Sequence, residues 1–378
     1  MKLIHLSDLH LGKRVNEFSM IEDQRYIVKE ILDIVKREEP DAVLIAGDVY
    51  DKPVPPVEAV ELFDSLLKQL SLLRVQVFII SGNHDSPERL AFASELIEMS
   101  GIHIAPAYHG QVRPFSFADA YGTVNIYMLP FIKPVHVRGA FPEEPVESYT
   151  DAVRTALSHM NVQETERNIL VTHQFVTGAV RSESEEISVG GSDNVDASVF
   201  AAFDYVALGH IHGPQHVGRE SIRYCGTPLK YSFSEAKHRK SVTILELREK
   251  GTLDIRTAEL VPLHDLRELK GTYEELTSRK NYEGTAVDDY LHITLTDEED
   301  ILDAIGKLRV IYPNLMKLDY DNRRTRENRE ITGGEDTGTK TPLELILEFY
   351  EKQNNQPMNE KQAALVSELM EKIWEEDK

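Results

Sequence analysis

The sequence contains a single cysteine, Cys225, among 378 residues. One cysteine cannot form a disulfide within the chain, and chains without disulfides are typical of the reducing cytoplasm. Long hydrophobic runs are also missing, since the longest apolar stretches, 42–46 and 75–80, are far too short to span a bilayer. The N-terminus lacks the apolar region and cleavage site of a signal peptide. We therefore expect a cytoplasmic protein with no membrane contact.

Positive charge is scarce as well. The chain has 42 Lys and Arg against 64 Asp and Glu, a net charge of −22. This balance argues against a protein that coats itself in nucleic acid through a broad basic face. It leaves room for a nuclease, because metal ions add positive charge at a site and a short basic strip can lie on an acidic body. Taken alone, a short basic stretch is more typical of an ordinary solvated surface than of a DNA contact. The candidate DNA contacts are Lys13, Arg14, Lys133, His136, Arg138 and His238.

The length predicts two or three domains, and 41% hydrophobic residues allow a large core. Up to about residue 260, apolar strand-like runs alternate with amphipathic helical patterns, which predicts an α/β fold with helices layered on sheets. Ligands in open α/β sheets gather beyond the carboxyl ends of strands. The expected strands are 3–7, 42–46, 75–81, 125–129, 169–172 and 205–208, and the clearest helices are 21–38 and 57–73.

A second, smaller α/β module is expected at 261–325. Strands are predicted at 289–296 and 315–320, and a helix between them should begin with a capping box formed by Thr296 and Glu299. The apolar stripe of that helix would contain Ile301, Leu302, Ile305 and Leu308.

The last part of the chain, from residue 326 on, is predicted to be a linker followed by two helices. Residues 326–340 are polar and charged and contain a Gly-Gly pair, as a linker does. Residues 341–378 contain two capping patterns, at Thr341 and Asn359, each followed by an apolar stripe. The helix pair either folds back on the body, which spans 1–260, or docks on a partner. We favour docking, because two capped helices after a linker suit a groove or coiled coil elsewhere.

Five short motifs place Asp, Asn or His directly after strand-like runs. Carboxylate, amide oxygen and imidazole suit Mn²⁺, Fe²⁺ or Zn²⁺ rather than a thiolate-bound metal. Two such ions about 3.5–4 Å apart can clamp a phosphate and lower the pKa of the attacking water. The motifs are Asp8-Leu9-His10, Gly47-Asp48-Val49-Tyr50-Asp51, Gly82-Asn83-His84-Asp85, Val171-Thr172-His173 and Gly209-His210-Ile211-His212.

Two ions that share a phosphate need a bridging ligand, and Asp48 is the carboxylate best placed to bridge. Asp8 and His10, two residues apart after a strand, can both point to one ion. His210 and His212 have the same spacing and could serve both ions. With Asn83 and His173 added, each ion has about four protein ligands and keeps room for water.

His84 is left over beside these ligands and is better suited to act as an acid. A leaving alkoxide needs a proton, and a histidinium near neutral pH can donate one. Asp51 or Asp85 could hold the other ring nitrogen of His84 and raise its pKa.

In this order, the motifs resemble those of the calcineurin-like metallophosphoesterases, over roughly the first 215 residues. A narrower resemblance, to the SbcD family of bacterial DNA-repair nuclease subunits, covers most of the chain and weakens toward the C-terminus. It is carried by IHLSDLHLG at 4–12, ISGNHDS at 80–86, YVALGHIH at 205–212 and YCGTPLKYSFS at 224–234.

The resemblance implies a two-sheet metallophosphoesterase sandwich flanked by helices, a small α/β capping domain and a C-terminal helix pair. One Mn²⁺ would be held by Asp8, His10, Asp48 and His212, and the other by Asp48, Asn83, His173 and His210, with Fe²⁺ possible. His84 would be the catalytic histidine. Archaeal relatives have a second histidine near the position of Asp51, so a second proton donor is left unassigned here.

The resemblance also implies partners and an activity. The chain would form a homodimer, through 21–38 or 57–73, and bind an SMC-like SbcC ATPase through its terminal helices. With DNA ends and hairpins as substrates, it would act as a 3′-to-5′ double-strand exonuclease and a single-strand or hairpin endonuclease. It would associate with the nucleoid while engaged.

Two other functions remain open. The same chemistry serves phosphatases and cyclic-nucleotide phosphodiesterases, but a small substrate needs neither a capping module nor docking helices. The other alternative is of a different class: a scaffold that binds both DNA ends and an ATPase. The intact set of ligands disfavours it, because a scaffold would not need an open metal site.

Overall fold

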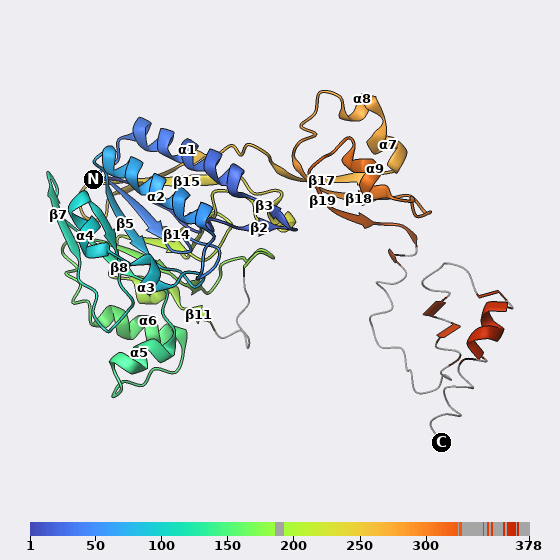
Figure 1. The fold of residues 1–378 in the computed structure, drawn as a ribbon. Coiled ribbons are helices and arrows are strands. Elements are labelled where there is room, and N and C mark those ends of the chain that lie inside the picture. Colours follow the sequence, from blue (N-terminus) through green and yellow to red (C-terminus); the bar gives the residue numbers. More distant parts are fainter. Residues whose placement is uncertain are drawn as a thin grey trace, which may run out of the picture. The chain divides into compact units, whose positions relative to one another are not determined.

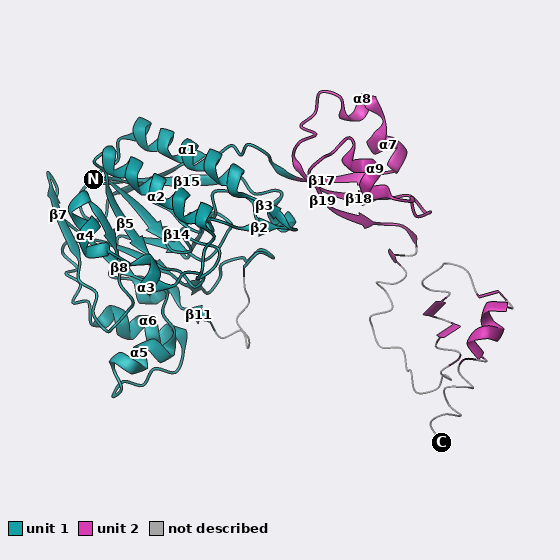
Figure 2. Cartoon of the chain, in the orientation of Figure 1, with its two compact units in different colours: residues 1–266 teal, residues 267–378 magenta. Residues whose placement is uncertain are grey.

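The computed structural model describes residues 1–185 and 193–323, then 325, 326 and scattered positions between 343 and 369. It divides into two compact units, residues 1–266 and 267–378 (Figure 2). The boundary predicted from the sequence is residue 260. The predicted linker, 326–340, lies outside the described residues except for its first position.

The first unit is built on two six-stranded sheets (Figure 1). The first sheet has the order β16-β15-β1-β4-β5-β6, in which β1, β4, β5 and β6 are parallel, β15 is antiparallel to β1, and β16 is antiparallel to β15. Its strands are β1 (Lys2–Leu6), β4 (Ala42–Ala46), β5 (Gln76–Ile80), β6 (Ile102–Ile104), β15 (Ser241–Leu247) and β16 (Leu253–Glu259).

The second sheet has the order β13-β14-β12-β9-β8-β7, with β8, β9, β12 and β14 parallel. Its strands are β7 (Phe115–Asp119), β8 (Gly122–Leu129), β9 (Arg167–His173), β12 (Tyr205–Gly209), β13 (Gln215–Val217) and β14 (Arg219–Tyr224). In the register between β12 and β9, Gly209 lies beside His173, the last residue of β9, so these two strands end side by side.

The sheets pack face to face through alternate residues of their strands. Leu44 and Phe78 of the first sheet and Ile169 and Ala207 of the second belong to one buried apolar cluster. The outer face of the first sheet is covered by α1 (Ile21–Glu38) and α2 (Val57–Leu72), and that of the second by α5 (Pro134–Ala140) and α6 (Tyr149–Ser158) (Figure 1). The predicted two-sheet sandwich with flanking helices is confirmed.

Shorter elements occupy the connections. They are β2 (Arg14–Val15), β3 (Phe18–Ser19), α3 (Pro87–Leu90), α4 (Ser94–Ile97), η1 (Glu98–Ser100), β10 (Phe175–Val176), β11 (Asn194–Val195), η2 (Ala197–Phe200) and η3 (Phe233–Glu235).

The second unit begins with a three-stranded sheet of order β17-β18-β19. Its elements are β17 (Leu266–Gly271), α7 (Tyr273–Thr277), α8 (Arg279–Tyr282), β18 (Tyr290–Leu295), α9 (Ala304–Arg309) and β19 (Leu315–Tyr320). Leu291, Ile293, Leu295 and Leu308 form its core.

The predicted start of the helix in this unit is wrong. The N–H of Thr296 donates to the carbonyl of Gly271, and Asp297 accepts from the N–H of Tyr273, so this acidic turn is held by neighbouring elements. The helix therefore begins only at Ala304. The predicted stripe is broken as well, because Leu302 is 85% exposed while Leu308 is buried.

Little of the predicted C-terminal helix pair falls on described residues. Residues 361–367 are helical, and Asn359 and Gln362 exchange the two hydrogen bonds of a capping box at 3.0 Å each. Thr341 and the stretch 370–378 lie outside the described residues. Among the residues that are described, we find no helix with the length and apolarity needed to cross a membrane.

Candidate metal centre

Seven candidate ligands come together where strands of both sheets end. Asp8 and His10 follow β1, Asp48 follows β4, Asn83 follows β5, His173 ends β9, and His210 and His212 follow β12. Backbone bonds hold the first two of these loops side by side, since the N–H groups of Asp8 and His10 donate to the carbonyls of Gly47 and Asp48. All the ligand candidates except Asn83 are buried.

Backbone strain is concentrated at these ligands. Asp8, His10, Asp48 and His210 have φ values of 52°, 44°, 49° and 102°, in a region that residues with a side chain rarely adopt. Such conformations cost of order 1–3 kcal/mol each and persist where surrounding structure enforces them, often at functional sites.

The first set of candidate metal donors consists of His10, His212, Asp48 and Asp8, whose side chains converge. The Nε2 atoms of His10 and His212 are 3.1 Å apart, and Nε2 of His10 is 3.7 Å from Oδ2 of Asp48. Asp8 belongs to the same cluster as these two histidines. Its Oδ1 accepts the N–H of His210, while its Oδ2 is buried with no hydrogen-bond partner among the described residues.

A second set lies on the other side of Asp48. Oδ1 of Asn83 is 2.9 Å from Nε2 of His173 and 2.9 Å from Nδ1 of His210. Oδ2 of Asp48 is 3.2 Å from Nε2 of His173, so this one oxygen faces both sets. The other carboxylate oxygen accepts the N–H of His84. Asp48 thus lies between the two sets of donors.

Two glycines are required by close approach to these groups. A Cβ on Gly82 would lie 2.1 Å from Oδ1 of Asp48. A Cβ on Gly209 would lie 1.8 Å from the carbonyl oxygen of Ala46 and 2.6 Å from Nδ1 of His173. That carbonyl accepts a hydrogen bond from Nδ1 of His173 at 2.9 Å, which leaves Nε2 as the nitrogen that can bind an ion.

In the metal-free site the buried groups have shifted pKa values, and a protonated group must release its proton before it can hold an ion. Burial lowers the pKa of His10 and of His210 well below the usual value, so both imidazoles are neutral donors at neutral pH. Burial opposes charge on His173 too, but Asp48 outweighs it and raises the pKa of His173 to about 9. Burial raises the pKa of Asp8 to about 6. Oxygen and imidazole donors, an unpartnered buried carboxylate oxygen and a shared carboxylate fit two divalent ions.

His84 lies beside the first set, with its ring 4.8 Å from that of His10. Its Nδ1 is 3.0 Å from the backbone carbonyl oxygen of Asp51. The carboxylate of Asp51 is bonded instead to Lys13 at 2.7 Å. Asp85 accepts the N–H groups of three residues, Val49, Tyr50 and Gly82. Of the two residues predicted to hold the His84 ring, Asp51 does so, through its backbone carbonyl rather than its carboxylate.

The six predicted DNA contacts fall into two groups. Lys13 lies over the ring of Tyr231, Lys133 over that of Phe131, and His238 beside Gly213, all next to residues of the metal centre. The other three are engaged locally: Arg14 donates to the carbonyl of Glu17 and Arg138 to that of Val146, and Nδ1 of His136 accepts the N–H of Lys133.

Sequence reasoning missed several residues around the centre. Arg181 stacks on Phe175 at 3.6 Å, and Phe175 lies beside His210. Ser184 is hydrogen-bonded to His212. The proximity of Phe175 to His173 in the chain is the one sequence signal that pointed to this region.

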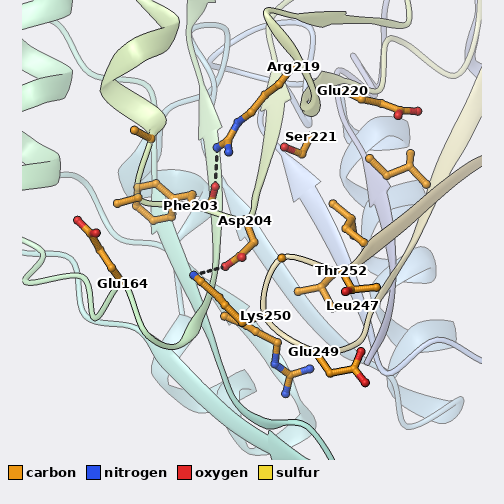
Figure 3. A pocket seen from close by; sticks show the side chains of 16 residues that line it. Glu164, Phe203, Asp204, Arg219, Glu220, Ser221, Leu247, Glu249, Lys250 and Thr252 are labelled. Atoms are coloured by element: carbon orange, nitrogen blue, oxygen red, sulfur yellow. Dashed lines mark hydrogen bonds and ion pairs between the residues drawn. The ribbon is translucent and has the colours of Figure 1, made fainter.

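A separate cavity of about 430 Å³ lies at the starts of β9, β12 and β14, away from the strand ends that carry the ligands (Figure 3). Arg219 donates to the carbonyls of Phe200 and Phe203. Asp204 pairs with Lys250 (Figure 3). These three charged side chains therefore all have partners within the protein. The residues that line this cavity include none of the seven ligand candidates.

Comparison with known proteins agrees with the geometry. Residues 1–214 match the family model described as calcineurin-like phosphoesterase, and residues 262–354 match the one described as type 5 capsule protein repressor C-terminal domain. The SbcD subunit of the nuclease SbcCD from Staphylococcus saprophyticus is 32% identical, with 100% of this chain and 99% of the relative covered. The protein of the same name from Staphylococcus epidermidis is 30% identical, with 100% of both covered.

Among solved structures, TT1561 of Thermus thermophilus is similar with 13% identity and a TM-score of 0.41. The similarity covers 69% of this chain and 99% of that chain.

Proposed function

This chain belongs to the SbcD family of nuclease subunits within the calcineurin-like phosphoesterases, and we propose that it cuts DNA ends with two Mn²⁺ ions. Its reactions would be 3′-to-5′ exonuclease cleavage of duplex ends and endonuclease cleavage of single strands and hairpins. The observation that carries the proposal is the position of Asp48, whose Oδ2 is 3.7 Å from Nε2 of His10 and 3.2 Å from Nε2 of His173. Fe²⁺ suits the same donors.

Each side chain then has a role. Asp8, His10 and His212 would hold one ion, Asn83, His173 and His210 the other, and Asp48 would be shared. The ions supply charge that stabilises the phosphate and makes the attacking water more acidic. With Nδ1 of His84 held by the carbonyl of Asp51, the opposite ring nitrogen can deliver a proton to the leaving oxygen.

The first test removes this acid. His84→Ala should lower Mn²⁺-dependent release of nucleotides from a linear duplex by about 10²–10⁴-fold, the usual contribution of a general acid. Both ions should stay bound, because each keeps all the ligands assigned to it, even though His84 also clusters with His10 and Asp48. The control is His216→Ala, which removes an exposed histidine on β13.

Three outcomes would count against the proposal. Full activity of His84→Ala would remove the acid role. Hydrolysis of small phosphodiesters without cleavage of DNA would favour a small-substrate phosphodiesterase. DNA-end binding by the wild type with no cleavage in Mn²⁺ or Fe²⁺ would favour a scaffold.

We further propose a homodimer through one exposed apolar surface. Phe92, Leu96 and Met99 are 82%, 78% and 95% exposed. Their segment lies along α2, because Arg89 donates to the carbonyl of Pro53 at one end and Ser71 to that of Ser100 at the other. The valines of α2 at positions 57 and 60 are exposed as well, whereas most apolar residues of α1 are buried. Between the two predicted helices, these exposures favour α2.

The proposed partner is an SbcC-type ATPase, bound through the helix pair at 341–378. The support is the resemblance to the named relatives over the whole chain and the capping box at Asn359. Since the relatives are named as subunits of one complex, docking explains a capped helix after a polar linker.

The molecular mass of the isolated chain in solution tests the homodimer contact, and co-purification tests the contact with the ATPase. Leu96→Glu should convert the isolated chain from dimer to monomer, whereas Leu302→Glu, at an equally exposed leucine in the second unit, should not. A chain ending at residue 340 should remain a dimer and keep basal nuclease activity, yet fail to co-purify with the ATPase. A dimeric Leu96→Glu variant would contradict the first assignment, and retained co-purification the second.

A further inference from the structure

A series of side chains, of which Ser184 is half-buried and Glu235 and Lys240 are buried, leads from His212 away from the metal centre. Oγ of Ser184 is 2.6 Å from Nδ1 of His212 and 2.5 Å from Oε1 of Glu235. The other carboxylate oxygen of Glu235 pairs with Nζ of Lys240. Glu235 and Lys240 are 0% and 4% exposed, so solvent does not screen this pair.

The chemistry of these groups sets the direction of each hydrogen bond. A carboxylate paired with an ammonium group only accepts, so the hydroxyl of Ser184 donates its proton to Glu235. Its oxygen then accepts from Nδ1–H of His212. The proton of a neutral His212 ring is thereby fixed on Nδ1, and the lone pair lies on Nε2, which faces Nε2 of His10 at 3.1 Å.

The same residues also fix the backbone of His212. Lys240 donates to the carbonyl oxygen of His212 at 2.9 Å and to Oγ1 of Thr227 at 2.7 Å, which together with Glu235 uses all three of its protons. The N–H of His212 donates to Oε1 of Glu185 at 2.6 Å. His212 is therefore held at its N–H, its carbonyl and its outer ring nitrogen.

We propose that Ser184, supported by the buried Glu235–Lys240 pair, is a positioning residue that fixes the tautomer and ring orientation of His212 for one of the two ions. The proposal rests on the two-ion site proposed above. It assigns to three residues outside the ligand motifs a share in metal affinity, because an outer partner of a ligating imidazole sets which nitrogen is free to bind.

The test compares three variants of the full chain. Ser184→Ala removes the acceptor nearest to Nδ1 of His212 and leaves Oε1 of Glu235 at 3.5 Å. Ser184→Thr keeps the hydroxyl. Ser234→Ala is the matched control, since Oγ of Ser234 accepts the N–H of Glu183 in the same segment at 3.0 Å. It thus loosens the segment without removing the group that holds His212.

Two readouts are needed. In metal-free protein, nitrogen NMR of labelled histidines should show His212 protonated at Nδ1, and Ser184→Ala should redistribute that proton between the ring nitrogens. In Mn²⁺ titrations followed by electron paramagnetic resonance and calorimetry, Ser184→Ala should weaken one ion by about 10–100-fold, the usual effect of losing such a partner. Ser184→Thr should restore affinity to near wild type, and Ser234→Ala should leave it unchanged.

Wild-type tautomer and wild-type affinity for both ions in Ser184→Ala would overturn the proposal. So would equal weakening by Ser184→Ala and Ser234→Ala, because placement of the segment would then explain the effect. A wild type that binds fewer than two ions would refute the proposed two-ion function instead, while the metal-free spectrum would still decide whether Ser184 fixes the His212 tautomer.

Discussion

His173 and His212 are both buried imidazoles at strand ends, but their outer nitrogens are held in different ways. Nδ1 of His173 donates to the backbone carbonyl of Ala46, at the end of β4 in the facing sheet. Nδ1 of His212 is held by the side chain of Ser184, which depends in turn on Glu235 and Lys240. One donor set is therefore anchored by the fold itself and the other by a replaceable side chain.

The two halves of the centre should therefore fail in different ways. A backbone carbonyl is present whatever residue occupies position 46, so point mutations reach the His173 anchor only by displacing the strands. The His212 anchor is removed by a single atom change at Ser184. Sensitivity to mutation should thus be steric in one half of the centre and chemical in the other.

The largest effect is expected at Gly209, where a methyl group would displace the backbone anchor. In Gly209→Ala the new Cβ would clash with the carbonyl of Ala46 and with Nδ1 of His173, so His173 should lose its orientation. Mn²⁺ stoichiometry should fall from two ions to one, and cleavage of duplex DNA by at least about 10³-fold, since both ions stabilise the same phosphate.

The control for Gly209→Ala lies four residues along the same loop. A Cβ on Gly213 would approach only the side chains of His238 and Gln215, at 3.1 Å and 3.6 Å, so Gly213→Ala should bind two ions. Thermal unfolding of both variants in a chelator shows whether each is folded. A folded Gly209→Ala protein that binds two ions with wild-type affinity would break the distinction between the two halves.

Much of the sandwich could be predicted because its central strands are apolar throughout. Residues 42–46 and 21–38 form a strand and a helix with the predicted bounds. The prediction lacks the edge strands β6, β7, β13 and β16 and the interior strands β14 and β15. The strand β6 has only three residues, and β14, β15 and β16 mix apolar residues with charged or hydroxyl ones, which gives little signal. In the second unit, Asp297 accepts a hydrogen bond from the N–H of Tyr273, which lies 24 residues earlier in the chain. No local sequence pattern reveals such a contact.

The ligand candidates could be recognised because each follows a strand whose own pattern is clear. The groups that orient them could not. Ser184 and Glu235 are 51 residues apart and lie outside regular motifs, so only the fold brings them together. For His84 the sequence named Asp51 as one of two partners but could not give the group, because a backbone carbonyl leaves no trace in residue type.

The smallest effect concerns His5, a buried imidazole next to the last residue of β1 and three residues before Asp8. It is not a candidate ligand, so the cost of its burial can be measured separately from metal binding. Its Nδ1 is 2.9 Å from the hydroxyl of Tyr205, and its Nε2 is buried with no hydrogen-bond partner among the described residues. Burial, with the charge of Arg223 adding to it, lowers the pKa of His5 from 6.5 to about 3. Between those values the unfolded chain binds more protons than the folded one, so stability is lost as the pH falls below 6.5.

His5→Gln removes this titration and keeps a side chain able to bond to Tyr205. In chelator-treated protein, the free energy of unfolding measured with urea should fall by about 2 kcal/mol more for wild type than for His5→Gln between about pH 7 and pH 5. Equal losses would mean that His5 is protonated in the folded state, and that burial in this sandwich does not by itself keep an imidazole neutral. The neutral state of His10 would then have to depend on the ions rather than on the fold.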